Sequence, residues 1–124
     1  MLKKISTEKA PKAVGPYSQA IEINNIVYTA GQIPIVAESG KIEASDISGQ
    51  AEQVMKNLQA VLEEAGTDFD HVVKTTCFLT DMADFAVFNE VYAKYITNAP
   101  ARSCVEVKSL PKGALCEVEI IAYK

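Results

Sequence analysis

The chain has 124 residues, a common length for one compact domain, so we expect residues 1–124 to form a single domain. Hydrophobic residues make up 48% of the sequence and charged residues 23%, which excludes a disordered tail or a fibrous repeat. The formal net charge of -4 argues against a protein that binds nucleic acid by neutralising phosphates, because such proteins usually carry a positive charge.

The sequence carries no sign of a membrane segment or an export signal. Uncharged stretches fall well short of the roughly 20 apolar residues that span a bilayer, and the N-terminal lysines lead into polar residues. Cys77, Cys104 and Cys116 have no metal-ligand spacing, and no C-x-x-C occurs. We therefore expect reduced, mostly buried thiols in a cytoplasmic protein without a metal site.

The first thirty-four residues predict a loop followed by a hairpin. Pro11, Gly15 and Pro16 indicate an ordered loop over residues 7–17, and a further short strand is expected at residues 2–6. Runs of β-formers at 18–24 and 26–30 flank Asn24-Asn25, a pair that tolerates a positive φ and predicts a tight turn. Pro34 then ends the second strand.

Two amphipathic helices follow. Apolar residues recur at helical spacing over residues 45–65, with Gly66 as the expected left-handed end and Gly49 expected to delay the first turn. The second helix is expected over residues 83–96, capped by Asp81 or Asp84. Its aromatic residues share one side and are expected in the core: Phe85, Phe88, Tyr92 and Tyr95.

Three further strands, at residues 71–80, 102–108 and 115–123, complete the order β-β-α-β-α-β-β. This order predicts an α+β sandwich, a mixed sheet with two helices on one face. In the last strand the side from Cys116 to Ala122 is expected to pack on the helices, whereas Leu115, Ile121 and Tyr123 share the open side with charged residues. A second copy of the chain is the obvious cover for such a face.

Arg102 and Glu117 are the residues with the clearest potential for chemistry. The planar fork of an arginine suits a carboxylate, and a partly desolvated glutamate can exchange protons with a water molecule. Together with Cys104 they are expected at or near a subunit interface. The structural alternative is an Arg102–Glu117 salt bridge across neighbouring strands, which would carry no chemistry.

Five blocks of sequence resemble the RidA/YjgF family of reactive intermediate deaminases. The most specific is PARSCVEV at residues 100–107, followed by Leu110-Pro111 and then CEVEI at 116–120. AVGPYSQA at 13–20, TAGQIP at 29–34, VKTTC at 73–77 and the segment 85–92 also match in order and spacing. The resemblance covers nearly the whole chain.

The resemblance implies a chorismate-mutase-like fold and a homotrimer, with a barrel-like centre and sites in the clefts between subunits. Members of the family hydrolyse 2-imino acids, or their enamine tautomers, to 2-oxo acids and ammonia. They need no cofactor or metal, and several relatives are known only for binding carboxylates. The partners expected for this chain are therefore small 2-imino and 2-oxo acids, and neither nucleic acid nor a membrane is expected. The implied substrates are 2-iminobutanoate and 2-iminopropanoate.

The resemblance also implies roles for six residues. Arg102 is expected to hold the substrate carboxylate, and Glu117 to orient or activate the attacking water. Tyr17 is expected to line the cleft. The remaining three are expected near the ligand: Gly31 through its backbone, Cys104 through main-chain groups, and Asn89 as a supporting side chain.

The chain departs from the family pattern near the expected cleft. The segment 95–100 is shorter than in many relatives, and Ala99 and Ala30 replace a common aromatic residue and a common serine. Two other functions stay open: a trimer that binds small carboxylic acids without turnover, and a ribonuclease that inhibits translation. The net charge and the single histidine argue against the ribonuclease.

Overall fold

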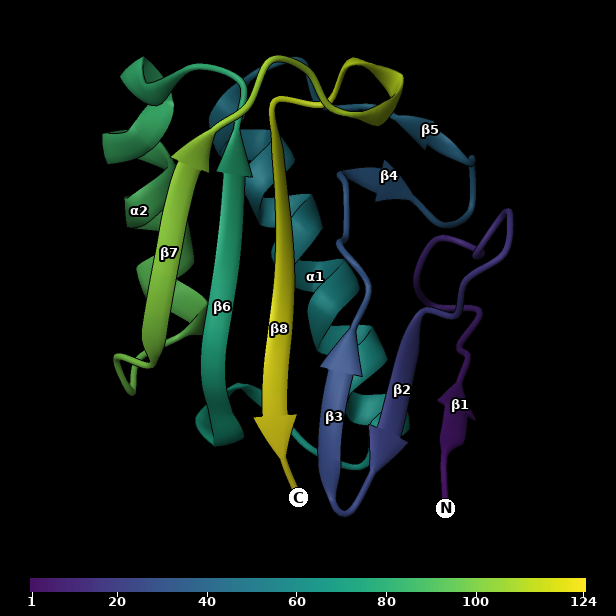
Figure 1. Cartoon of the computed structure of the whole chain (residues 1–124). Coiled ribbons are helices and arrows are strands. Elements are labelled where there is room, and N and C mark those ends of the chain that lie inside the picture. Colours follow the sequence, from purple (N-terminus) through teal and green to yellow (C-terminus); the bar gives the residue numbers. More distant parts are fainter.

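A computed structural model describes all of residues 1–124 as two layers. One layer is a six-stranded sheet with the order β1-β2-β3-β8-β6-β7, and the helices α1 and α2 both lie on one face of it (Figure 1). The prediction of a mixed α+β sheet with two helices on one face is therefore confirmed. No helix is both long enough and apolar enough to cross a membrane.

The elements follow the predicted order with one addition. The strands are β1 (Lys3–Ile5), β2 (Ala20–Ile23), β3 (Ile26–Thr29), β4 (Ile35–Val36), β5 (Lys41–Ile42), β6 (Val72–Leu79), β7 (Ala101–Glu106) and β8 (Cys116–Tyr123). The helices are α1 (Ile47–Ala65) and α2 (Phe85–Tyr95), and 3₁₀ turns precede β6, α2 and β8. The addition is the small hairpin β4–β5, whose two-residue strands are too short to show an alternating pattern.

The turn between β2 and β3 confirms the asparagine prediction. Asn24 and Asn25 have φ values of 51° and 62°, the left-handed pair that a two-residue hairpin turn requires. Ile23 and Ile26 therefore pair directly across the turn. This register sends Val27 into the core and Tyr28 to the open face of the sheet.

The start of α1 lies two residues after the predicted bound at residue 45. The helix begins at Ile47 with Asp46 as its N-cap, so Gly49 belongs to its first turn. The Asp46 carboxylate accepts a hydrogen bond from the backbone N–H of Gly49 at 2.9 Å, and a Cβ on Gly49 would lie 2.9 Å from that oxygen. The glycine therefore makes room for the cap. Gly66 ends the helix at φ 83°, as predicted.

The start of α2 separates the two candidate caps. Asp81 accepts from the backbone N–H of Ala83 at 2.9 Å, which caps the short 3₁₀ turn Met82–Asp84. Asp84 makes no capping hydrogen bond, and α2 itself begins at Phe85. Asp81 is thus the cap of this helical segment as a whole.

The core lies between α1, α2 and the covered face of the sheet. The alternation predicted for the last strand is confirmed, because Cys116, Val118, Ile120 and Ala122 are each at most 1% exposed. The helices contribute large apolar side chains that are equally buried, among them Met55, Leu58, Leu62 and Phe88. Only this face is covered, so the other face carries the half-exposed Tyr28, Val105 and Tyr123.

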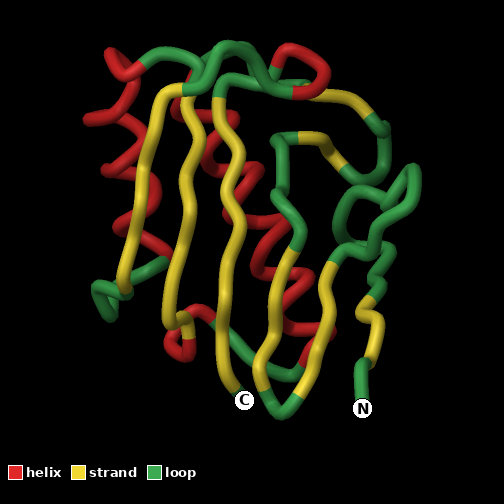
Figure 2. Tube along the Cα trace, in the orientation of Figure 1, coloured by secondary structure: helices red, strands yellow, loops and turns green.

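Gln19 fixes the long loop between β1 and β2 (Figure 2). Its side chain is 3% exposed, accepts from the backbone N–H of Thr7 at 2.7 Å and donates to the C=O groups of Thr7 and Pro11 at 3.1 and 2.7 Å. The loop contains Tyr17, so this one amide helps to position a candidate site residue.

We expect Gln19→Ala to lower the free energy of unfolding by about 1–3 kcal/mol, because it leaves backbone groups of the loop without partners. Chemical denaturation at a fixed protein concentration measures the loss, and hydrogen exchange measures the opening of residues 7–17. Gln59→Ala, on the exposed side of α1, is the matched control. Equal losses in both variants, or unchanged exchange in the loop, would contradict this role.

Candidate functional site

Arg102 lies on the edge strand β7 against the face of α2. Its Nη1 donates to the Asn89 Oδ1 at 2.7 Å, and its guanidinium carbon lies 4.8 Å from the centre of the Tyr92 ring and 5.4 Å from that of Phe85. Rings at this distance attract a cation without neutralising it. None of the three ion pairs in the chain involves Arg102. We call Phe85, Asn89, Tyr92 and Arg102 the arginine cluster.

Tyr92 connects the arginine cluster to the core. Its hydroxyl shares a hydrogen bond of 2.8 Å with the Thr75 hydroxyl, which is fully buried on β6. Burial raises the pKa of Tyr92, so its hydroxyl stays protonated. The ring under Arg102 is therefore fixed at its far end by a neutral hydrogen bond.

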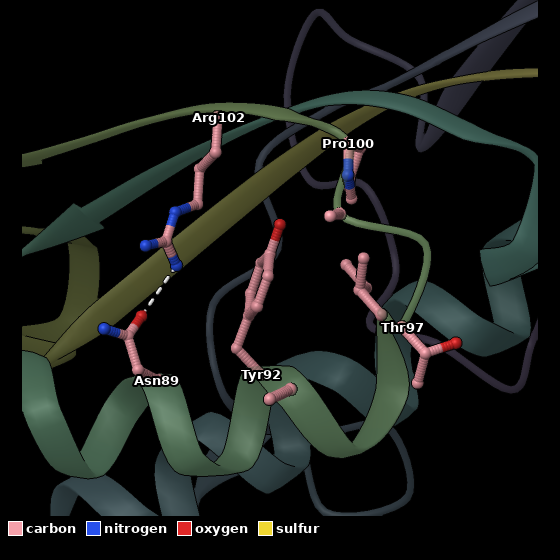
Figure 3. Close-up of a pocket in the computed structure, with 8 residues that line it drawn as sticks. Asn89, Tyr92, Thr97, Pro100 and Arg102 are labelled. Carbon is pink, nitrogen blue, oxygen red and sulfur yellow. Dashed lines mark hydrogen bonds between the residues drawn. The ribbon is translucent and has the colours of Figure 1, made fainter.

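A hollow of about 510 Å³ opens beside the arginine cluster, between the end of α2 and the start of β7. Figure 3 shows Arg102 and Tyr92 on one side of it and Thr97 and Pro100 on the other. Ala99 also lines it and has a φ of 50°, in the left-handed region. The residue at which the chain departs from the family pattern thus lines the same hollow as Arg102.

Glu117 lies on β8, on the open side of the sheet, and is half-buried. Burial raises its pKa, and the neighbouring Glu119 carboxylate raises it further. Its side chain packs against Gly31: a Cβ built on Gly31 would lie 1.9 Å from Glu117 Oε2. The requirement for glycine at this position is therefore a requirement for space, filled by the Glu117 carboxylate.

Two contacts hold the backbone of Gly31 beside β8. Gln32 and Val118 exchange backbone hydrogen bonds of 2.9 and 3.2 Å, an isolated bridge just beyond the end of β3. The buried Asn57 of α1 donates to the C=O groups of Ile33 and Ile35 at 3.1 and 2.9 Å. The segment after Gly31 is therefore tied both to the sheet and to the helix beneath it.

A second hollow, of about 560 Å³, contains Glu117, Gly31 and the 54%-exposed Tyr17. We call these three residues the glutamate cluster. Ala30 also lines this hollow, as do Lys12 and Lys112, two cationic residues that sequence patterns did not single out. Both hollows fall within the size range of small-molecule sites.

The two clusters lie on opposite faces of the sheet. In the register of β6 and β7, Arg102 is opposite the buried Thr75, so it points to the helix side, whereas Glu117 is opposite Phe78 and points to the open side. Strand β6 also separates β7 from β8. The alternative of an Arg102–Glu117 salt bridge across neighbouring strands is therefore wrong for a single chain.

The structure brings the predicted residues together in two groups. Asn89 contacts Arg102 directly, and Cys104 lies two residues further along β7 on the same side. Phe85 and Tyr92 were expected only as core residues, yet both rings contact the guanidinium. The sequence held a signal for this cluster. Residues 85, 89 and 92 share one helix face, and the amide of Asn89 between two aromatic residues indicates that this face contacts a polar group.

No group of three or more His, Cys, Asp or Glu side chains is arranged to hold a metal ion. The free polar groups of the site are instead the guanidinium of Arg102 and the carboxyl of Glu117. The fold and these groups define the class of the protein: a two-layer α+β protein with a guanidinium on the helix side of the sheet and a half-buried carboxyl on the open side.

Comparison with known proteins identifies the family. Residues 7–124 match the model described as Endoribonuclease L-PSP. A RutC family protein of Pyrococcus abyssi is 54% identical over 97% of this chain and 95% of its own, and the 2-iminobutanoate/2-iminopropanoate deaminase of Mus musculus is 45% identical over 98% and 91%. The crystal structure of Escherichia coli TdcF with bound serine superposes with a TM-score of 0.94 at 40% identity, covering 98% of both chains. The chain belongs to this family, which is also known as RidA/YjgF/RutC.

We expect Gly31→Ala to lower the pKa of Glu117 towards its ordinary value. The added Cβ takes the place of the carboxylate, which moves into solvent and loses the desolvation that raises its pKa. Titration of labelled glutamate carboxyl carbons by NMR measures the shift. Gln59→Ala, exposed on α1, is the control. An unchanged Glu117 pKa in Gly31→Ala would contradict the packing role.

Proposed function

We propose that this protein hydrolyses reactive 2-imino acids, such as 2-iminobutanoate and 2-iminopropanoate, to 2-oxo acids and ammonia. The observation that carries the proposal is that one chain holds a guanidinium oriented by neutral groups, with no carboxylate partner, and on the other face of the sheet a half-buried carboxyl of raised pKa. The name of the mouse relative supports the same reaction, and the serine bound to TdcF supports a site of amino-acid size.

The site is proposed to form between copies of the chain, in a homotrimer with a barrel-like centre. Within one chain a substrate of three or four carbon atoms cannot reach both Arg102 and Glu117, because the sheet lies between them. The open face also carries half-exposed apolar side chains that another copy would cover: Tyr28, Val105 and Tyr123. Arg102 of one subunit would then face Glu117 of its neighbour.

Arg102 is proposed to hold the substrate carboxylate. Asn89 occupies one N–H of the guanidinium, which leaves further donors for a two-pronged contact with a carboxylate. Because Asn89 and the rings of Phe85 and Tyr92 carry no charge, the full positive charge remains for the substrate. A lysine could neither stack on the rings in the same way nor offer two parallel donors.

Glu117 is proposed to act on the attacking water. Its carboxylate takes a proton from water as the oxygen bonds to the imine carbon, and the C=N double bond becomes a single bond. Glu117 passes this proton to the nitrogen, which gives an intermediate with a hydroxyl and an amino group on the same carbon. Glu117 then moves the hydroxyl proton to the nitrogen, so the C–N bond breaks, ammonia leaves and the C=O of the 2-oxo acid forms. A raised pKa suits this exchange, because the same group must accept and return a proton near neutral pH.

The other named residues are proposed to shape the cleft. Tyr17 lines the glutamate hollow and can donate a hydrogen bond from its hydroxyl to substrate or water. Gly31 keeps the Glu117 carboxylate in its half-buried position. Cys104 is proposed to contribute main-chain groups beside the carboxylate, so its thiol needs no role in the reaction.

Free 2-imino acids hydrolyse in water unaided, so this arrangement needs neither a strong nucleophile nor a metal ion. Fixing the anion and one water molecule reduces the entropic part of the barrier. A positioned base adds about 10²–10⁴-fold. This acceleration suffices to remove an intermediate before it modifies another protein.

Exchange between subunits provides the sharpest test. Arg102→Ala and Glu117→Gln are each expected to lose at least about 10²-fold in activity. When the two proteins are unfolded, mixed in equal amounts and refolded, about a quarter of the sites of a closed ring receive a native Arg102 from one copy and a native Glu117 from the next. We therefore expect up to about a quarter of the wild-type activity to return.

The assay generates 2-iminobutanoate in place with a threonine dehydratase and follows trapping by semicarbazide. A mixture of Arg102→Ala with the double variant contains no Arg102 and is expected to stay inactive. Full activity in either single variant, or no recovery in mixed oligomers of wild-type size, would contradict the proposal. Binding of 2-oxobutanoate without imine hydrolysis by wild type would indicate a carboxylate-binding protein instead.

The pH dependence tests the role of Glu117. Activity is expected to rise with pH as Glu117 loses its proton, with a midpoint above the ordinary pKa of a glutamate. Glu119→Gln removes the like charge that raises this pKa, so the acidic limb of kcat/KM is expected to move to lower pH. Glu63→Gln, exposed on α1, is the control. A limb that does not move would exclude Glu117 as the titrating group.

A further inference from the structure

Cys77 and Cys104 lie directly opposite each other on the parallel strands β6 and β7. Neighbouring strands are about 4.8 Å apart, which falls within the Cα separations of roughly 4.4–6.8 Å that disulfides span. Cys77 follows Thr75 by two residues on β6, and Cys104 follows Arg102 by two residues on β7. Side chains two residues apart on a strand point the same way, so both thiols lie on the helix side of the sheet. The two thiols are close enough to shift each other's pKa.

The third cysteine does not compete for this pairing. Cys116 on β8 is opposite Leu79, whereas Cys77 is opposite Val118. Cys116 is therefore the diagonal neighbour of Cys77, at a typical separation of about 7–8 Å. A disulfide cannot bridge more than about 7 Å without movement of the backbone. Only Cys104 is in position to bond with Cys77.

The two thiols differ in access. Cys77 is 0% exposed and burial raises its pKa to about 12, whereas Cys104 is only partly buried. Burial also raises the pKa of Cys104, but the nearby Arg102 guanidinium opposes the rise. An oxidant from solvent therefore meets Cys104 first, and Cys77 lies behind it as the thiol that completes the bond.

We propose that Cys77 and Cys104 are a site of reversible oxidation, at which a small-molecule disulfide converts the two thiols into an intrachain disulfide. The bond joins β6 to β7 immediately beside the arginine cluster. The modification does not require the protein to be an enzyme.

The oxidation proceeds by two exchanges. The Cys104 thiolate attacks one sulfur of the small disulfide, which releases one small thiolate and leaves a mixed disulfide on Cys104. Cys77 then attacks the Cys104 sulfur, and the second small thiolate leaves. The two cysteines lose two electrons and two protons, and the small disulfide takes them up as two thiols. Because Cys77 is buried and protonated, we expect the second step to take minutes to hours.

The bond is expected to weaken the binding of carboxylates, an effect that rests on the proposed role of Arg102. The strand spacing already suits a disulfide, but the bond holds the two Cβ atoms about 3.5–4.5 Å apart. It therefore draws the side chains of Cys77 and Cys104 together and constrains β7 two residues from Arg102. A shift of about 1 Å in a site can cost about 10²-fold. We therefore expect roughly a tenfold rise in the Kd of a 2-oxo acid.

The test treats the native protein with oxidised glutathione and maps its cysteines by mass spectrometry. Wild type and Cys116→Ala are expected to lose two hydrogens and to yield a peptide pair joined through Cys77 and Cys104. Cys77→Ala is expected to stop at a glutathione adduct on Cys104. Titration with 2-oxobutanoate then compares reduced, oxidised and re-reduced protein, with the tenfold weakening expected only in the oxidised wild type and Cys116→Ala.

Several outcomes would overturn the inference. They are a glutathione adduct in wild type that never resolves, a bond that includes Cys116, a bond between chains, or three thiols that stay free. A disulfide that leaves the Kd unchanged would overturn its effect on the site. Failure of the reduced protein to bind 2-oxobutanoate would count against the proposed function alone, because the mass measurement still decides whether the disulfide forms.

Discussion

The alternation of side chains along three neighbouring strands is the constraint on which the site depends. Through the pairing of β7, β6 and β8, the side chains of Arg102 and Glu117 point to opposite faces of the sheet, so the sheet itself separates them. To bring them to one face, a strand would have to shift its register by one residue, and that shift would also turn its core side chains outwards. The proposed reaction, which needs both groups, would therefore take place between two copies of the chain.

The side chains of Arg102 and Glu117 are held in different ways, and the difference affects the charge of each group. Arg102 is oriented by rings and an amide that leave its charge intact, whereas a carboxylate partner in the same chain would compete with an anionic ligand. Glu117 is held by close contact with Gly31, and its desolvation favours the neutral form. One cluster thus keeps its charge available, and the other lowers the free-energy cost of taking up a proton.

Local patterns predicted the elements well, but they could not predict how distant strands meet. The left-handed turn at Asn24-Asn25 and the end of α1 at Gly66 follow from backbone chemistry at single positions. The insertion of β6 between β7 and β8 depends on pairings distant in sequence, which no local pattern encodes. For the same reason Tyr92 was assigned to the core alone. Helical spacing indicates that its ring faces inwards, but not that Arg102 of another strand lies across it.

The polar groups buried behind Arg102 explain how an exposed side chain can be placed accurately. Thr75 is fully buried, and its hydroxyl forms a hydrogen bond with the hydroxyl of Tyr92. The thiol of Cys77 lies two residues further along the same strand. An apolar core would favour a branched hydrocarbon at Thr75, and such a side chain would leave the Tyr92 hydroxyl without its partner. One of the buried polar residues therefore lies where the core supports the edge strand. The hydrogen bond in the core therefore also fixes the ring on which the guanidinium of Arg102 lies.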